Sequence, residues 1–209
     1  MQVVVTAGPT REYVDPVRFL SNESSGRMGF AIAAAAARAG HRVTLIAGPV
    51  HLATPRGVAR VDVVTARELL AAVRQAFGRA DALIMAAAVA DWRPARRLVG
   101  KWRKKDEGGH ETSLRLIRNP DVLATVGKRK GARRIVAFAL ETGDGVRRAQ
   151  AKLKRKNADF IVLNGPSALN AARTDVTILD QDGEVERHRV ASKEAVAAAI
   201  VARLRTQVR

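Results

Sequence analysis

The residues best suited to bind an anion stand just before an alanine-rich stretch, in the segment SNESSGRMGF. Ser24, Ser25 and Gly26 come at the start of a predicted helix, where unpaired N–H groups and the helix dipole attract negative charge. A glycine there lets a ligand approach the backbone closely. The same residues could form an ordinary serine cap with a packing glycine, so the turn alone leaves both interpretations open.

Two polar residues precede this turn. Asn22 is neutral and can donate and accept hydrogen bonds at once, so it could hold a carbonyl or a developing oxyanion. Arg18 could bind a carboxylate or a phosphate through its guanidinium group. The alternatives are a loop asparagine that bonds its own backbone and a solvated arginine.

Further along the chain, charged residues occur at spacings that suit a polyphosphate. Lys152 and Lys156 are four apart and so share one face of a helix, where like charges cost a few tenths of a kcal/mol that a bound polyphosphate would offset. A solvated basic face is the alternative. Asp91 and Asp121 could each contact a ribose hydroxyl or Mg²⁺, although Asp121 also suits a first helical turn.

The segment that follows Asp91 is strongly basic and has few apolar residues to anchor it. We expect a flexible lid at about 92–110 that closes over a negatively charged ligand. A flexible basic loop and a nucleic-acid contact are alternatives, but only Trp92 and Trp102 could stack on bases. The basic residues are Arg93, Arg96, Arg97, Lys101, Arg103, Lys104 and Lys105.

Composition sets the frame for this chemistry. The 209 residues carry a net charge of +17, which attracts polyanions unless it reflects a general enrichment in arginine. Cysteine is absent, so disulfides and thiolate nucleophiles are excluded, and we expect a cytoplasmic protein. The sequence has neither a signal-peptide pattern nor an apolar run long enough to span a membrane. We expect one domain over residues 1–209.

Apolar strands alternate with helices, which predicts an α/β fold of the doubly wound, Rossmann-like class. We expect a mostly parallel sheet with helices on both faces, an edge strand at 113–117, and a C-terminal antiparallel hairpin with a type I′ turn at Asp182-Gly183. The expected strands are 2–6, 42–46, 60–64, 82–87, 134–140, 160–164, 176–179 and 184–190. The expected helices are 26–39, 65–77 with Thr65 and Glu68 as a capping box, one starting at Asn119-Pro120, 144–156, and one from Ser192 to about 205.

Three strand ends carry unusual sequence: TAGPT, AAAVADWRP and FALET. In a parallel sheet these ends meet at one rim, where such folds bind ligands. The connection after the first strand is far longer than the usual two to six residues, which is typical of a functional loop.

Taken together, these motifs resemble phosphopantothenoylcysteine synthetase. The shared segments are TAGPTREYVDPVRFLSNESSGRMGFAIA, AAAVADWRP, NPDVLA, FALET and KLKRKNADFIVLN, with a lysine ten residues after Asp91, over about residues 3 to 190. The resemblance implies a stand-alone synthetase, without the flavin-dependent decarboxylase domain that many bacteria fuse in front of it, so a separate decarboxylase is a possible partner. It also implies a homodimer, with the 9–22 arm as a candidate interface.

The implied reaction joins 4′-phosphopantothenate to L-cysteine, with CTP and Mg²⁺. The substrate carboxylate attacks the α-phosphate of CTP, giving an acyl-cytidylate and pyrophosphate; the cysteine amine then displaces CMP. No protein nucleophile is needed, so catalysis would rest on positioning and charge stabilisation.

The resemblance also implies roles for individual residues. Lys101 would stabilise the first transition state, and Asn22 would act on the acyl-cytidylate. Arg18 would reach the substrate, possibly from the other subunit, near Ser24, Ser25 and Gly26. The residues implied for the nucleotide are Ala86, Ala87 and Phe138 for the base, and Asp91, Asn119, Pro120, Asp121, Val122, Lys152 and Lys156 for the ribose and triphosphate.

The chain departs from the family pattern at several positions. Ala137 replaces a glycine and Leu140 an alanine in the Gly-Phe-Ala-Ala-Glu-Thr motif. Gly165 replaces an aspartate, and Trp102 and Arg103 interrupt the lysine motif of the lid. These changes leave CTP and ATP as alternative nucleotides.

Two other classes compete with this interpretation. A short-chain dehydrogenase shares the TAG turn but needs a Tyr-x-x-x-Lys pair, and Val17 follows the only tyrosine, Tyr13, by four residues. A basic nucleic-acid-binding module would explain the charge but not the neutral SNESSG loop.

Overall fold

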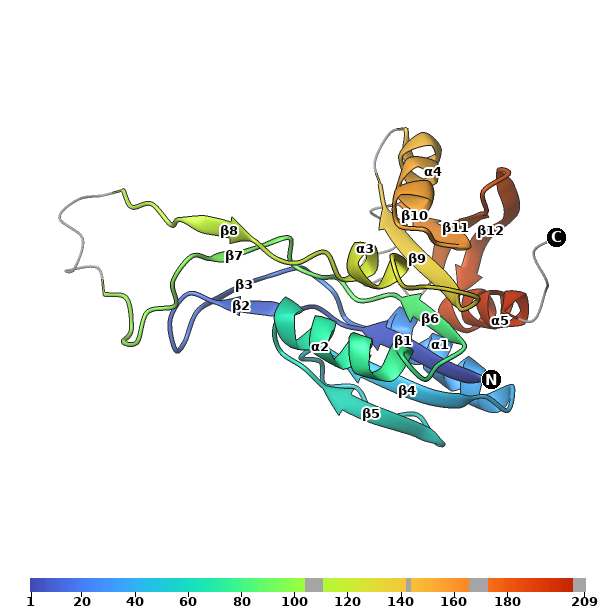
Figure 1. Cartoon of the computed structure of the whole chain (residues 1–209), viewed down its shortest axis with the longest axis horizontal. Helices are drawn as coiled ribbons and strands as arrows, with labels where there is room; N and C mark the ends of the chain where they lie inside the picture. Colours follow the sequence, from blue (N-terminus) through green and yellow to red (C-terminus); the bar gives the residue numbers. More distant parts are fainter. Residues whose placement is uncertain (104–110, 142–143, 166–172, 205–209) are drawn as a thin grey trace.

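The computed structural model describes residues 1–103, 111–141, 144–165 and 173–204. Its centre is an eight-stranded sheet in the order β12-β11-β10-β9-β6-β1-β4-β5 (Figure 1). The parallel strands are β1 (Gln2–Ala7), β4 (Arg42–Ala47), β5 (Val58–Asp62), β6 (Ala82–Met85), β9 (Arg134–Leu140) and β10 (Phe160–Asn164). The antiparallel strands are β11 (Arg173–Leu179) and β12 (Glu184–Ser192). The predicted doubly wound α/β sheet is confirmed.

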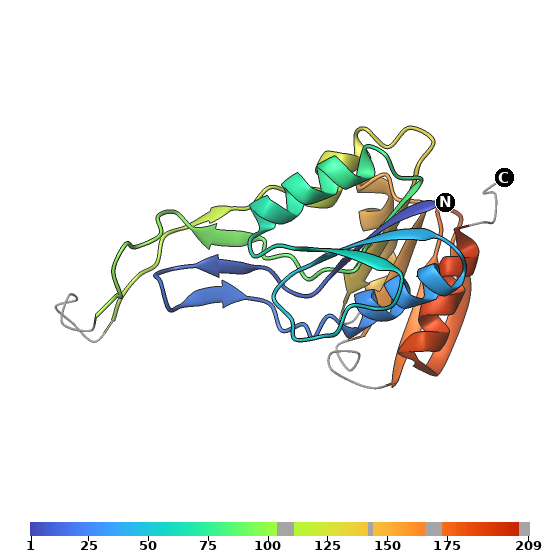
Figure 2. The same ribbon diagram turned by 90° about the horizontal axis from the view of Figure 1, so that it is seen from below.

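Helices cover both faces of this sheet (Figure 2). Side chains alternate along each strand, so Val3 and Val5 of β1 pack on one layer and Val4 packs on the other. Because both faces are buried, the parallel strands are apolar nearly throughout. One layer consists of α1 (Arg27–Arg38) and α5 (Lys193–Arg203), and the other of α2 (Ala66–Phe77), α3 (Val122–Gly127) and α4 (Gly145–Arg155).

Two of the predicted helix starts are confirmed and one is wrong. The Thr65 side chain accepts a hydrogen bond from Glu68 N at 3.2 Å to cap α2, and Ser192 caps α5. The predicted start at Asn119 is wrong, because Asp121 caps α3 by accepting from Ala124 N at 2.8 Å. The side chain of Asn119 is instead used in a tertiary contact.

An arm built from two short ribbons extends away from the sheet (Figure 1). One ribbon pairs β2 (Arg11–Tyr13) with β3 (Phe19–Ser21), and the other pairs β7 (Trp92–Pro94) with β8 (Leu116–Arg118). The long connection after β1 is therefore a hairpin. The prediction of an edge strand at 113–117 is wrong, because β8 pairs with β7 outside the main sheet. Residues 104–110 of the predicted lid lie outside the described residues.

The C-terminal hairpin is present, but its turn is not of type I′. The strands pair as far as Leu179 and Glu184, so four residues form the loop. Asp180 Oδ1 accepts hydrogen bonds from Asp182 N at 2.9 Å and Gly183 N at 3.1 Å. A type I′ turn needs positive φ at both central residues. Among the described non-glycine residues only Asn157 and Val190 have positive φ, so Asp182 does not meet this requirement.

Helix α1 lies so close to β1 that Gly29 has no room for a side chain. A Cβ atom there would lie 2.5 Å from Ala7 Cβ and 2.9 Å from Thr6 O. We expect Gly29→Ala to lower the free energy of unfolding by about 1–3 kcal/mol, because the helix must shift from the sheet. Urea unfolding measures this. Gly78→Ala is the matched control, since its nearest neighbour would be Arg74 O at 3.4 Å; equal losses in both variants would contradict the argument.

Candidate functional site

A cleft opens at the carboxyl ends of the parallel strands, where the strand order reverses. Strands β4 and β5 lie on one side of β1, and β6, β9 and β10 lie on the other. Two cavities of about 550 Å³ and 540 Å³ meet there and share the residues Ala87, Val89, Asp91, Phe138 and Lys152. We call them the α1 cavity, which is lined by residues 22–29, and the α3 cavity, which is lined by residues 118–123.

The turn before α1 opens onto the α1 cavity. Gly26 is the N-cap residue, with a left-handed φ of 74°, and no side chain caps the helix. Gly26 N lies 3.4 Å from Ser24 Oγ, a contact within the turn itself. The alternative of an ordinary serine cap is therefore wrong, and a glycine is required by the positive φ. The anion site at this helix start stays a prediction that the geometry permits.

Buried threonines position the loop after β6. Ala87 N donates to Thr6 Oγ1 at 3.1 Å, and Ala90 N donates to Thr10 Oγ1 at 3.0 Å. Both threonines are almost fully buried, so these bonds fix the loop that carries Asp91. Sequence reasoning missed this role; the available signal was a hydroxyl at each end of the apolar TAGPT turn.

Asn119 ties the start of α3 to the same loop. Its Nδ2 donates to Ala90 O at 2.8 Å, its Oδ1 accepts from Arg93 Nη1 at 3.1 Å, and its backbone N donates to Asp91 O at 2.8 Å. With all these groups engaged inside the protein, Asn119 shapes the α3 cavity, and its neighbours Pro120, Asp121 and Val122 line it.

Both lysines predicted to share a face of α4 line the α3 cavity. Lys152 Nζ donates to Phe138 O at 2.8 Å, and Lys156, only 9% exposed, forms an ion pair with Asp121. Burial acts to raise the pKa of Asp121, but hydrogen bonds from Lys156 and Ala124 N hold the pKa below its ordinary value. Asp121 is thus a charged partner for Lys156 as well as a helix cap.

The two candidate metal ligands differ in their surroundings. Asp121 already accepts from Lys156 and Ala124 N, whereas Asp91 is exposed and lines both cavities. Across the described ranges, no three His, Cys, Asp or Glu side chains converge on one point. Mg²⁺ commonly binds through one or two carboxylates together with substrate phosphates, which Asp91 fits better than Asp121.

Arg18 and Lys101 lie on the arm and do not line either cavity. Arg18 Nη1 donates to Trp102 O at 2.8 Å, and Trp102 N donates to Asp15 Oδ2 at 3.0 Å. These contacts hold the segment after β7 against the β2–β3 hairpin, and Lys101 is exposed there. The structure therefore brings together Asn22, Ser24, Ser25, Gly26 and the nucleotide candidates, but not the two arm cations.

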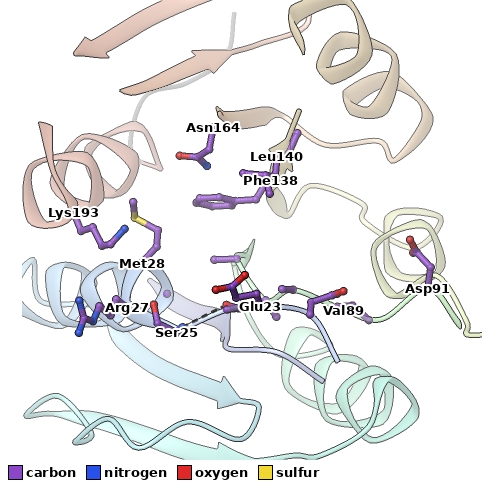
Figure 3. A pocket seen from close by; sticks show the side chains of 18 of the residues that line it. Glu23, Ser25, Arg27, Met28, Val89, Asp91, Phe138, Leu140, Asn164 and Lys193 are labelled. Carbon is purple, nitrogen blue, oxygen red and sulfur yellow. Dashed lines mark hydrogen bonds between the residues drawn. The ribbon is translucent and has the colours of Figure 1, made fainter. Parts of the chain in front are cut away.

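The departures from the family motif fall in different places. Ala137 is fully buried in the core between the sheet and α2, α3 and α4, so this change does not reach the cleft. Leu140 lines the α1 cavity and Gly165 lines a separate cavity beside β11. Figure 3 shows Leu140 and Phe138 at the cleft with Asn164 beside them.

Sequence reasoning missed four residues that line the α1 cavity. Met28 and Phe138 lie on opposite sides of it, and the Lys193 side chain extends into it from α5 (Figure 3). No local motif marks these residues, since each reaches the cleft only through tertiary packing. The four are Arg27, Met28, Asn164 and Lys193.

The whole fold has known counterparts. Residues 1–207 match the family model described as DNA/pantothenate metabolism flavoprotein C-terminal domain. The bifunctional coenzyme A biosynthesis protein CoaBC of Escherichia coli K12 is 45% identical over 189 residues, covering 88% of this chain and 47% of the relative. A prokaryotic protein named cysteine/cysteine sulfinic acid decarboxylase is 42% identical over 213 residues, covering 99% and 58%.

Solved structures agree with these matches. The crystal structure of a CoaBC C-terminal domain has a TM-score of 0.83 at 38% identity and covers 97% of this chain and 93% of that one. A protein of the same description from Streptococcus pneumoniae has a TM-score of 0.82 at 21% identity, covering 98% of each chain, which supports the fold alone. The chain spans about half the length of the curated relatives it matches. Within the described ranges, every helix is too short or too polar to cross a bilayer.

Proposed function

The chain belongs to the family of DNA/pantothenate metabolism flavoprotein C-terminal domains, and on this basis we propose that it is a phosphopantothenate–cysteine ligase. In the proposed reaction, the carboxylate of 4′-phosphopantothenate attacks the α-phosphate of CTP and pyrophosphate leaves. The cysteine amine then attacks the acyl carbon of the acyl-cytidylate and CMP leaves. Related proteins named for coenzyme A biosynthesis support this assignment.

One observation carries the proposal: the cleft has two ends suited to phosphate and a neutral middle. The α3 end presents Lys152 and Lys156 beside a helix start, and the α1 end presents an uncapped helix start at Gly26. Between them lie Ala87 and Phe138, which line both cavities. A nucleotide and a phosphorylated acid can lie end to end in such a cleft, with their reacting groups near its centre.

Each residue of the cleft then has a role. The backbone at Ala86 and Ala87 and the Phe138 ring hold the base, and Asp91 contacts the ribose or the Mg²⁺ that the phosphates carry. Asn22 holds the acyl oxygen during attack by the amine. The triphosphate lies at the α3 end, against Asn119, Pro120, Asp121, Val122, Lys152 and Lys156.

The arm makes the active unit a homodimer in this proposal. Several apolar side chains of the ribbons are exposed: Val17, Phe19, Trp92 and Leu116. A second copy would cover them and would place Arg18 at the neighbouring cleft, which its own cleft lacks.

Mixing two inactive variants tests whether Arg18 acts across the dimer. In a heterodimer of Arg18→Ala and Asn22→Asp, one cleft has an intact Asn22 and receives an intact Arg18 from its partner. We expect activity to return to about a quarter of the wild-type level after subunits are mixed and allowed to exchange. No recovery would contradict an exchange of Arg18 between subunits, because a site built within one chain is broken in both copies.

Nucleotide binding should weaken at a lower pH than is usual for a lysine site. Burial lowers the pKa of Lys152, the charge of Lys156 lowers it too, and Glu141 opposes them. A lysine with a lowered pKa loses its proton, and its attraction for phosphate, as the pH rises towards 10.5. Lys152→Arg stays charged throughout, so its affinity for CTP should persist at pH values where the wild-type affinity falls. Calorimetric titration between pH 7 and 10 measures this, and parallel pH profiles would contradict it.

The direct test of the function is product formation. Purified protein is incubated with 4′-phosphopantothenate, L-cysteine, Mg²⁺ and either CTP or ATP, and mass spectrometry detects phosphopantothenoylcysteine. Product with CTP supports the proposal as stated, and product with ATP alone supports the same ligase with the other nucleotide. Absence of product with both would refute the ligase, and salt-dependent DNA binding would then be measured for the basic-module alternative.

A further inference from the structure

Lys193 places a buried cation at the α1 end of the cleft. It is the first residue of α5, directly after the cap residue Ser192, and it is only 8% exposed. Its side chain extends from α5 towards Met28 and the α1 cavity, which it lines (Figure 3). Lysine is seldom buried to this degree without a strong interaction to offset its desolvation.

The surroundings of Lys193 are electrostatically unfavourable for a cation. The first turn of a helix repels positive charge, and Arg27, the first residue of α1, lines the same cavity. Burial lowers the pKa of Lys193 and the charge of Arg27 lowers it further, while Glu194 acts in the opposite direction. Glu23 also lines the cavity, but it is exposed. A dianionic phosphate would offset the repulsion between the two cations and the two helix starts.

The chain before Lys193 is strained in a way that fixes where α5 begins. The pairing of β11 with β12 shifts register between Thr174 and Val176, and Val190 adopts a φ of 46°. A β-branched residue in the left-handed region costs of order 1–3 kcal/mol and persists only where the surroundings enforce it. Here Val190 N donates to Asp175 Oδ1 at 2.6 Å. This irregular strand end sets the direction in which the chain enters α5, and with it the placement of Lys193.

We propose that Lys193 is a substrate-binding residue that contacts a phosphate group at the α1 end of the cleft. This inference rests on the proposed ligase function and adds a residue to it. The phosphate has two possible sources, the 4′-phosphate of phosphopantothenate and the phosphates of the nucleotide. Because Lys152 and Lys156 serve the α3 end, the 4′-phosphate is the source that leaves each end with one ligand group.

Steady-state kinetics on Lys193→Met test the proposal. Losing one charge-assisted contact should raise the KM of the substrate that carries the phosphate about 10- to 100-fold, with a smaller change in kcat. Lys193→Arg should recover part of the loss, because it keeps the charge. Lys154→Met is the matched control, since Lys154 lies on α4, is exposed and lines neither cavity. Lys193→Gln replaces the methionine variant if thermal unfolding shows that the latter does not fold.

The pattern of KM values identifies the source of the phosphate. A rise for 4′-phosphopantothenate alone assigns the 4′-phosphate, and a rise for CTP or ATP alone assigns the nucleotide. Values within twofold of wild type for every substrate would overturn the inference while leaving the ligase intact. If the wild-type protein makes no product, calorimetric binding of 4′-phosphopantothenate and inorganic pyrophosphate still decides: equal affinities in wild type and Lys193→Met overturn the inference, and a loss confined to the variant supports it although the ligase fails.

Discussion

Replacing Asn22 by aspartate is expected to leave pyrophosphate release running while formation of the cysteine adduct falls about 10²- to 10³-fold. Asn22 lines the α1 cavity near the start of α1, where an amide can donate a hydrogen bond to the acyl oxygen. An aspartate of nearly equal size would accept but not donate when ionised, and its charge would repel the oxyanion. The first step needs no such donor in the proposed reaction, so the acyl-nucleotide should accumulate.

Quenched-flow sampling with separate assays for pyrophosphate and for the adduct measures both steps. Asn22 is exposed, so the thermal unfolding midpoint should match that of the wild type and serves as the control. Adduct formation at the wild-type rate would show that Asn22 has no part in the second step.

Replacing Lys101 by alanine is expected to act one step earlier, lowering pyrophosphate release itself about 10²- to 10³-fold. The proposed role of Lys101 is to stabilise the charge that builds on the α-phosphate during attack. The segment around Lys101 is held by Trp102, whose backbone N donates to Asp15 and whose O accepts from Arg18. Because these contacts involve backbone atoms, the substitution should remove the charge without releasing the segment.

Lys128→Ala is the matched control, since Lys128 is exposed at the end of α3 and lines neither cavity. A pyrophosphate rate for Lys101→Ala equal to that of this control would remove Lys101 from the mechanism. A loss of adduct formation with normal pyrophosphate release would move its role to the second step.

Local pattern was sufficient to predict the sheet and the rim that carries the cleft. The apolar runs in β1, β6 and β9 mark strands buried on both faces, and the residues that follow them mark the ligand side of the sheet. This reasoning placed Ala87, Asp91 and Phe138 together, and the structure confirms that they share one cleft.

Other features depend on contacts between distant segments and could not be predicted in this way. Asn119 and Asp121 are both good cap residues, and only the contact of Asn119 with Ala90 O decides that Asp121 caps α3. The pairing of β7 with β8 likewise joins segments more than twenty residues apart. Lys193 follows Asn22 by far more, and the two meet only because α5 packs beside α1.

The most direct test of the two-step account is pyrophosphate release from the wild-type protein with cysteine withheld. The protein is mixed with Mg²⁺, CTP or ATP, and either 4′-phosphopantothenate or no acid. We predict release that requires 4′-phosphopantothenate but not cysteine, because the carboxylate is activated before the amine attacks. Release that requires cysteine as well, or that occurs without 4′-phosphopantothenate, would contradict an acyl-nucleotide intermediate formed in this cleft.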